Sequence, residues 1–312
     1  MAIVANTFTT FSAIGNREDL ADVIYNISPT DTPFMANIGK AKASGVLHEW
    51  QTDALAPPGA NAQLEGDEVA FAAATPTTRL GNRCQISRKE AVVSGTQDVV
   101  DKAGRQREMT YQLMKRSKEL RRDMEATLTG NQAPVVGNTT TARQLRPLCS
   151  WYATNDSRGA GGADGTATTA ATDGTQRALT EVLFKGVLQT CWDAGGDPNL
   201  VMVGSFNKTV ISTFTGNVTK YQDTSNQKLS ANIDVYRSDF GTHRIVANRF
   251  SRSRDAHVLD TSMWALATLR APKTVDLAKT GDAEKAMIIT EYTLESRNEA
   301  ASGIVADLTV IP

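Results

Sequence analysis

The N-terminal stretch of the chain alternates short apolar segments with proline and glycine. Residues 17–27 carry their apolar side chains at helical spacing, and Asn16 can cap the helix that this spacing predicts. A second short apolar segment follows at 33–38. Two pieces of this size cannot bury their apolar faces against each other, so they need another surface. We therefore expect residues 1–45 to form an arm, packed on its own domain or on a neighbouring chain.

Two segments of alternating polarity, 45–55 and 83–95, predict β-strands. Between them, residues 56–82 are rich in Ala, Pro, Gly and Thr and hold few large apolar side chains. This connection is too long for a tight hairpin and too poor in apolar residues to form a core of its own. We expect a long two-stranded projection over 46–94, which at about 3.3 Å per residue reaches roughly 40–50 Å.

The strongest helical pattern in the chain lies at residues 105–128. Its apolar stripe has 4-7-4-4 spacing and consists of Met109, Leu113, Leu120, Met124 and Leu128. The helix is about 36 Å long at 1.5 Å per residue. Seven Lys and Arg against four acids on this segment leave two interpretations open. One is a solvated face with ion pairs between successive turns, and the other is a contact with nucleic acid.

A low-complexity segment of Gly, Ala, Thr and Asp occupies residues 153–176. It does not match the phosphate-binding pattern G-x-G-x-x-G, because Asp164 stands where the third glycine belongs. Such a composition predicts a mobile surface loop without a packed core. We expect an insertion at Gly161-Gly162 to leave the subunit folded.

The second half of the chain begins with an amphipathic helix at 177–196 and a buried strand at 200–205. Ser205 is predicted to cap a further short helix. From residue 231 onward, alternating patterns predict a run of strands. Helices and strands in separate runs are typical of an α+β fold.

Composition and charge limit the classes of protein to which the chain can belong. It has 312 residues, of which 40% are hydrophobic and 21% charged, with a formal net charge of −1 and a pI near 6.3. A protein whose main task is binding nucleic acid usually shows a strong basic excess, which is missing here. The N-terminus lacks the pattern of a signal peptide, and no segment approaches the roughly 20 apolar residues of a membrane span. We expect cytoplasm-like conditions and no membrane partner.

The metal-ligating residue types show no ligand spacing. Cys84, Cys149 and Cys191 lie far apart, without a Cys-x-x-Cys pair, and the three histidines do not cluster. These are His48, His243 and His257. The spacing therefore predicts unpaired thiols in a reducing compartment, hydrogen-bonded structural histidines and no metal site.

Two short motifs raise the hypothesis of a serine acyl transferase. Ser205 and Lys208 fit the Ser-x-x-Lys box of penicillin-binding enzymes, and residues 279–281 are Lys-Thr-Gly. The middle box fails, because its nearest match at 238–240 ends in Phe. A Ser-x-x-Lys match arises by chance about once in a chain of this Ser and Lys content. We predict no catalytic residue and no cofactor.

Several separate blocks of the sequence, in the same order, resemble the major capsid proteins of tailed phages. The blocks are NREDLADVIYNISPTDTPFM (16–35), QISRKEAVVSGTQ (85–97), ELRRDMEATLTGN (119–131), WDAGGDPNLVMVGSFNKTVISTF (192–214) and LAKTGDAEKAMIITEYTLESRNEAASGIVADL (277–308). These proteins share the Hong Kong-97 capsid fold. The resemblance makes the Lys-Thr-Gly segment a turn between two strands, with no catalytic role for Lys279.

The resemblance also implies a division of the chain into the parts of that fold. It predicts an N-terminal arm, an extended β-hairpin called the E-loop, a P domain that contains a long spine helix, an A domain, and strands that return to the P domain. The predicted ranges are 1–45, 46–94, 95–204 with the spine helix at 105–128, 205–261 and 262–312.

The function implied is that of a structural major capsid protein. Such a chain self-assembles into hexamers and pentamers of an icosahedral head that encloses double-stranded DNA without sequence-specific binding. Scaffold, portal and decoration proteins are its candidate partners, and it is assembled in the host cytoplasm and found in the virion. A near-neutral chain suits a container, because a strongly basic lining would hold the packaged DNA. A cellular nanocompartment shell of the same fold remains the alternative, and the acyl transferase is a more distant one.

Some shells of this fold are cross-linked by isopeptide bonds that start from a lysine on the projection. Residues 52–88 contain no lysine, and a guanidinium with a pKa above about 12 is not a usable nucleophile. Lys89 is expected at the base of the projection, out of reach of a neighbour. Mature particles boiled in detergent should therefore run as one band near 33.5 kDa. A ladder of covalent oligomers would contradict this prediction and would implicate Lys89.

Overall fold

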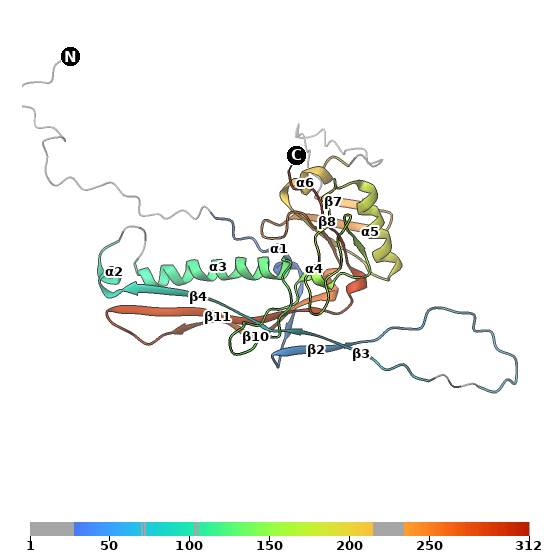
Figure 1. The fold of residues 1–312 in the computed structure, drawn as a ribbon, viewed down its shortest axis with the longest axis horizontal. Helices are drawn as coiled ribbons and strands as arrows, with labels where there is room; N and C mark the ends of the chain where they lie inside the picture. Colours follow the sequence, from blue (N-terminus) through green and yellow to red (C-terminus); the bar gives the residue numbers. More distant parts are fainter. Residues whose placement is uncertain are drawn as a thin grey trace, which may run out of the picture.

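Two β-sheets, a long helix and a two-stranded projection make up the computed structural model of the chain (Figure 1). The structure describes residues 28–69, 71, 73–102, 104, 106–214 and 234–311. The helix predicted at 17–27 lies outside these residues. The mixture of helices and sheets confirms the α+β class.

A four-stranded sheet forms the long body of the molecule, in the order β1-β10-β11-β4. Its strands are β1 (Gly39–Lys42), β4 (Gln85–Ser94), β10 (Trp264–Asp276) and β11 (Ala283–Ser296). β1 runs parallel to β10, and the other pairs are antiparallel. The turn between β10 and β11 spans 277–282 and uses Gly281 at φ +73°. The predicted turn at the Lys-Thr-Gly segment is therefore confirmed.

The helix α3 (Glu108–Thr129) lies along β4 and β11 (Figure 1). Four residues of the predicted stripe are buried, and Leu113 is partly buried. The helix begins three residues later than predicted, because an acid from another helix caps it. Asp98 of α2 (Gly95–Val99) accepts hydrogen bonds from the backbone N–H groups of Glu108 (3.0 Å) and Met109 (3.4 Å).

A six-stranded sheet follows the order β5-β12-β9-β6-β8-β7. Its strands are β5 (Asp156–Ser157), β6 (Leu200–Val203), β7 (Val235–Ser238), β8 (Gly241–Ala247), β9 (Ala256–Leu259) and β12 (Gly303–Val305). Two helices pack with it, α5 (Glu181–Asp193) and α6 (Ser205–Ile211). All four residues of β6 are buried, because each face of the sheet meets a different apolar cluster. Such two-sided burial explains the unbroken apolar run Leu-Val-Met-Val.

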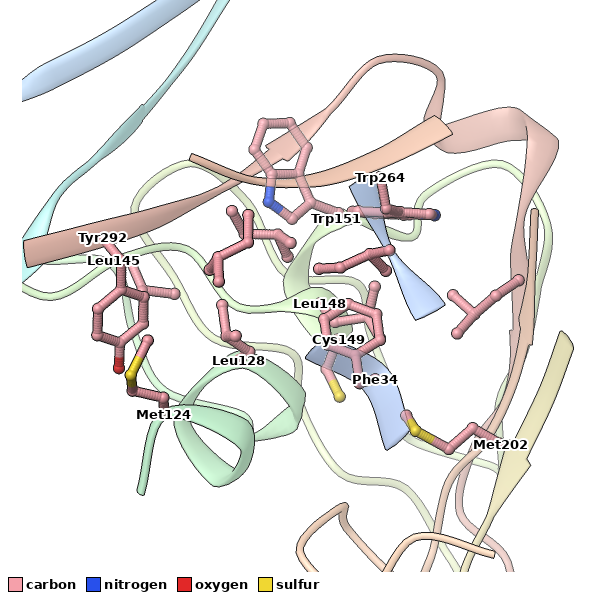
Figure 2. Packing of buried hydrophobic residues seen from close by; sticks show 14 of the residues in the cluster. Phe34, Met124, Leu128, Leu145, Leu148, Cys149, Trp151, Met202, Trp264 and Tyr292 are labelled. Atoms are coloured by element: carbon pink, nitrogen blue, oxygen red, sulfur yellow. The ribbon is translucent and has the colours of Figure 1, made fainter. Parts of the chain in front are cut away.

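The larger apolar cluster lies where the two sheets, α3 and the N-terminal segment meet. Figure 2 shows side chains from α1 (Pro33–Asn37), α3 and α4 (Leu148–Trp151) in this cluster, with Trp264 and Tyr292 from the strands of the long sheet. Trp264 and Tyr292 are among the largest fully buried side chains. Short 3-10 turns at Thr261–Met263 and Glu299–Ala301 lead into β10 and β12. This cluster joins elements that are distant in sequence into one continuous body.

The projection is built from a different strand pair than predicted. β2 (Leu47–Thr52) pairs with β3 (Thr78–Arg83), whereas the predicted partner segment forms β4 and pairs with β11. Residues 78–83 hold a single large apolar side chain, so periodicity gave no strand signal there. β3 is held by its backbone pairing with β2 and by the buried Asn82 amide, which donates to the Arg146 and Leu294 carbonyl oxygens, and not by an apolar face.

The segment 153–176 lies at the surface but is tied down, so the prediction of a mobile loop is wrong. The buried Asp307 carboxylate accepts hydrogen bonds from the N–H groups of Gly159 (3.0 Å) and Gly174 (2.8 Å). Asp173 receives Arg252 at 2.6 Å and Arg254 at 3.2 Å. Composition could not reveal this, because the groups that hold the loop come from residues about eighty positions or more further along the chain.

Leu120→Asp in α3 should abolish soluble folding of the subunit. Leu120 is 2% exposed within the main cluster, so an aspartate there is a buried, unpaired charge that costs several kcal/mol. Arg121→Glu, on the exposed side of the same turn, should leave folding intact and act, if at all, on assembly. The yield of soluble protein and thermal unfolding measure both variants. Equal behaviour of the two would refute the packing of α3.

Gly174→Ala should destabilise the subunit by about 1–3 kcal/mol. An added Cβ would lie 2.6 Å from the Gly159 carbonyl oxygen and 2.7 Å from the Gly162 nitrogen. Gly186→Ala is the matched control, because its Cβ meets open space in an exposed helix position. That control should stabilise the protein by roughly 0.5–1 kcal/mol. Denaturant unfolding compares them. A neutral Gly174→Ala would show that the loop is not held as described.

Candidate assembly surfaces

The base of the projection is held on the body by alternate residues of β2. The indole nitrogen of Trp50 donates to the Ser296 carbonyl oxygen at 2.7 Å, and its ring lies 5.7 Å from that of Trp151. His48 Nε2 lies 3.0 Å from Glu295 Oε2. The residues between these face outward, as the alternation of a strand requires. β2 therefore leaves the body in a fixed direction.

Glu295 is the charged part of this anchor. Burial raises its pKa, but hydrogen bonds from His48 and Arg297 outweigh burial and hold the pKa below the ordinary value. The Arg297 Nε atom lies 2.9 Å from Glu295 Oε1. The carboxylate is thus ionised at neutral pH and holds both partners.

Beyond β2 and β3, the projection exposes large apolar side chains. Phe71 and Leu55 are 93% and 98% exposed. Leu64 and Val69 are also exposed, at 81% and 71%. Among the described residues of 53–77 there is no helix or strand that could cover them. Fully burying one such side chain is worth about 1.5–3 kcal/mol, so this surface favours contact with another molecule.

The N-terminal segment is joined to α3 by one buried carboxylate. Glu125 accepts the backbone N–H groups of Phe34 (2.7 Å) and Met35 (3.0 Å) and the side-chain amide of Asn248 (2.7 Å). Burial raises the pKa of Glu125, and these donors oppose the rise. Phe34 itself is fully buried in the main cluster. Residues 33–38 thus dock on their own subunit before β1 begins.

The residues of the acyl-transfer hypothesis do not share a site. Ser205 is the first residue of α6, and the N-cap is Gly204, so the predicted cap at Ser205 is wrong. The extended backbone of Gly204 presents its carbonyl oxygen to the Lys208 N–H at 3.0 Å, and no side-chain cap is made. The Lys208 ammonium binds Asp234 and the Ile245 carbonyl oxygen, each at 3.1 Å.

Lys279 lies at the tip of the β10–β11 hairpin, at the opposite end of the molecule from α6 (Figure 1). It is 69% exposed and pairs with Glu284 at 3.2 Å. Ser238 instead caps the β7–β8 turn, where it bonds His243 at 2.6 Å. The three boxes therefore do not converge, and the motifs are accidental.

The predictions for the histidines and cysteines hold only in part. The three cysteines are free and buried, and His243 is hydrogen-bonded to Ser238 and to the Pro198 carbonyl oxygen. The fold also brings Cys149, Asp255 and His257 together, with ligand atoms within 4.8 Å of one another. Burial lowers the pKa of His257 to about 3 and raises the pKa of Cys149. Spacing missed this group, because its members come from two distant segments.

Several polar side chains of α3 are engaged within the subunit. Arg116 pairs with Glu119 at 2.7 Å, and Asp123 pairs with Lys89 of β4 at 2.6 Å. Arg122 lies 5.2 Å from the ring centre of Phe250. These contacts favour the solvated face with ion pairs over a nucleic-acid contact. Lys89 was expected at the base of the projection, but it lies in β4 within the body sheet, because that segment pairs with β11.

No helix in the described part of the chain has the length and apolar content of a membrane span.

Comparison with known proteins identifies the family of the chain. The family model described as SU10 major capsid protein matches residues 3–309. The chain belongs to this family of phage capsid proteins.

A curated relative is the major capsid protein of Escherichia phage Phieco32, which is 28% identical, with 96% of each chain covered. Among solved structures, the capsid of cyanophage A-1(L) has a TM-score of 0.66 at 13% identity, with coverage of 96% of this chain and 98% of that one. The capsid chain of a native GTA particle has a TM-score of 0.65 at 9% identity, with coverage of 96% and 98%. These structures share the fold, so the Hong Kong-97-like architecture is confirmed.

Membership of the family gives the capsid protein a structural role as the shell subunit of a phage head, and it places the protein in the virion. No comparison supports the nanocompartment alternative.

Glu295→Ala should loosen the base of the projection, because it leaves His48 without its acceptor. The loss of about 1–3 kcal/mol should speed amide exchange in β2 of the unassembled subunit by about tenfold or more. Glu49→Ala, which removes an exposed pair with Arg79, is the control and should change little. Hydrogen exchange read by mass spectrometry tests both. Unchanged exchange in the Glu295 variant would contradict the anchor.

The same anchor should weaken in acid. The pKa of Glu295 is held below the ordinary 4.5, so its ionised form contributes stability above that pH. That contribution is lost as the pH falls through the lower folded-state pKa, and exchange in β2 of the wild-type subunit should then approach that of the Glu295 variant.

Proposed function

We propose that this capsid protein assembles into hexamers and pentamers of an icosahedral head, with the projection of each subunit lying on a neighbouring copy. The observation that carries the proposal is the exposure of four large apolar side chains on the projection, from 71% to 98%. They have no cover within the described part of their own subunit. A second copy of the chain offers the repeated surface that a closed shell requires.

Rigidity at the base and freedom at the tip suit this role. Trp50 and Glu295 fix where β2 leaves the body, while residues 53–77 carry no regular structure of their own in the described part. An icosahedral shell places one chain in several near-equivalent settings, so a fixed root with an adaptable tip meets each neighbour. Modest contacts repeated around the shell then give high total stability.

In this proposal, each predicted part of the chain has a role in the capsid subunit. The four-stranded sheet with α3 serves as the P domain, and the six-stranded sheet with α5 and α6 serves as the A domain. The range 205–261 covers β7, β8 and β9, and the same sheet also takes β5, β6 and β12, with the helix α5, from outside that range. Residues 1–45 act as the arm, and 46–94 include the E-loop.

The shell encloses double-stranded DNA, and its assembly in the host cytoplasm uses scaffold and portal proteins. Decoration proteins are further candidate partners. The net charge of −1 and the engagement of the α3 cations Arg116 and Arg122 within the subunit support a lining that does not bind DNA tightly. The subunit works by contact alone, without a catalytic residue.

The experiment replaces the apolar side chains of the projection. In the triple variant Leu55→Ser, Leu64→Ser and Phe71→Ser, we expect a folded subunit that no longer forms shells, since the contact with the neighbour loses its apolar area. The control Asn61→Ala and Gln63→Ala changes exposed polar residues of the same segment and should assemble normally. Circular dichroism reports folding, while sedimentation and negative-stain microscopy report assembly. Normal shells from the triple variant would overturn the proposal.

A further inference from the structure

A group of potential metal ligands lies in the interior of the subunit, at the edge of the main apolar cluster. Cys149 of α4, Asp255 and His257 of β9 are all buried, and the side chain of each is at most 1% exposed. One ligand atom from each lies within 4.8 Å of the others. The Cys149 Sγ atom is 3.5 Å from Asp255 Oδ2.

The fold explains why these side chains meet. Asp255 and His257 are two residues apart in an extended segment, so they point to the same face of the sheet. Leu259 continues that face and belongs to the main cluster, whereas Ala256 and Val258 face the second cluster. α4 packs against the first face. Its neighbour Tyr152 stacks on the ring of His257 with centroids 5.9 Å apart, so Cys149 arrives beside the imidazole.

His257 carries the second, independent observation. Its side chain is fully buried, and neither ring nitrogen has a hydrogen-bond partner among the described residues. Leaving one buried polar group unpaired costs about 1–3 kcal/mol, so such an imidazole is rare unless something binds it. Both other histidines of the chain do have polar partners.

We propose that Cys149, Asp255 and His257 bind one Zn²⁺ ion that joins α4 to the six-stranded sheet. Zinc takes thiolate, imidazole and carboxylate ligands at about 2.0–2.3 Å, which sets ligand atoms roughly 3.2–3.8 Å apart in a tetrahedron. The 3.5 Å between Cys149 Sγ and Asp255 Oδ2 already lies in that range. The set of one sulfur, one nitrogen and one oxygen suits zinc better than magnesium or calcium, which prefer oxygen alone.

Charge also balances at this position. A thiolate and a carboxylate together neutralise the two positive charges of the ion. The neighbouring Arg252, whose NH1 is 3.1 Å from Asp255 Oδ2, is neutralised separately by Asp173 at 2.6 Å. Binding displaces the thiol proton of Cys149, which is released to solvent as the ion enters during folding. These residues supply three of the four ligands of a tetrahedral site, and a water molecule takes the fourth position. The site is structural, because all three side chains are buried and no substrate reaches them.

The first measurement uses the full-length wild-type chain, produced with Zn²⁺ and dialysed free of loose metal. Elemental analysis should give about one zinc per chain. With Co²⁺ in place of zinc, a thiolate-to-cobalt charge-transfer band should appear in the near ultraviolet. The double variant Cys84→Ser and Cys191→Ser should keep this band, because Cys149 is then the sole thiol.

Variants assign the ligands. Cys149→Ser and His257→Asn should each lower bound zinc at least tenfold. The matched controls Cys191→Ser and His243→Gln change a buried thiol and a buried imidazole outside the group, and they should retain the full zinc content. If a ligand variant does not fold, the cobalt band of the Cys84, Cys191 double variant still decides.

Two results would overturn the site. One is wild-type protein without stoichiometric zinc, which would leave the group as a metal-free thiol-to-carboxylate hydrogen bond. The other is zinc that persists unchanged in the folded Cys149 and His257 variants. Either result leaves shell assembly through the projection untouched, because the triple variant of the projection tests that separately.

Discussion

The subunit depends on one apolar cluster that is shared by both sheets, the long helix and the N-terminal segment. Leu128, Leu148 and Trp264 bring residues more than a hundred positions apart into the same interior (Figure 2). Glu125 adds the polar part, since its buried carboxylate holds Phe34 and Asn248 at once. Buried acceptors of this kind specify one arrangement, because any other arrangement would leave them unpaired.

The projection lies outside this interior and cannot bury its own apolar side chains. The body buries its largest apolar side chains, among them Trp264 and Phe34, whereas the projection leaves Leu55 and Phe71 almost fully exposed. A single subunit therefore has a stable core and an unsatisfied edge. In the proposed shell, a neighbouring copy covers the apolar side chains that the subunit leaves exposed. The anchor at Trp50 and Glu295 fixes the direction of the projection before it binds a neighbour. A projection free to move would lose more conformational entropy on binding.

Local patterns predicted much of the molecule. The stripe on α3, the turn at Gly281 and the buried strand β6 followed from periodicity and turn chemistry, since each is decided within a few residues. Other predictions were wrong at helix starts, where a residue other than the expected one satisfies the first backbone N–H groups. The Asp98 carboxylate accepts the first backbone N–H groups of α3, so the helix starts later than predicted. Gly204, and not Ser205, is the N-cap of α6. The separation of Ser205 from Lys279 likewise needed the fold.

The sequence alone determined the family and the α+β class, together with the near-neutral charge of the chain and the existence of a projection. These are properties of composition, order and local spacing. Only the tertiary structure decided that β2 pairs with β3, that Asp307 ties down 153–176, and that Cys149 meets His257. Each of these joins residues through backbone pairing or buried polar contacts. Such contacts leave no periodic trace in the sequence, because the partners are separated by tens to more than a hundred residues.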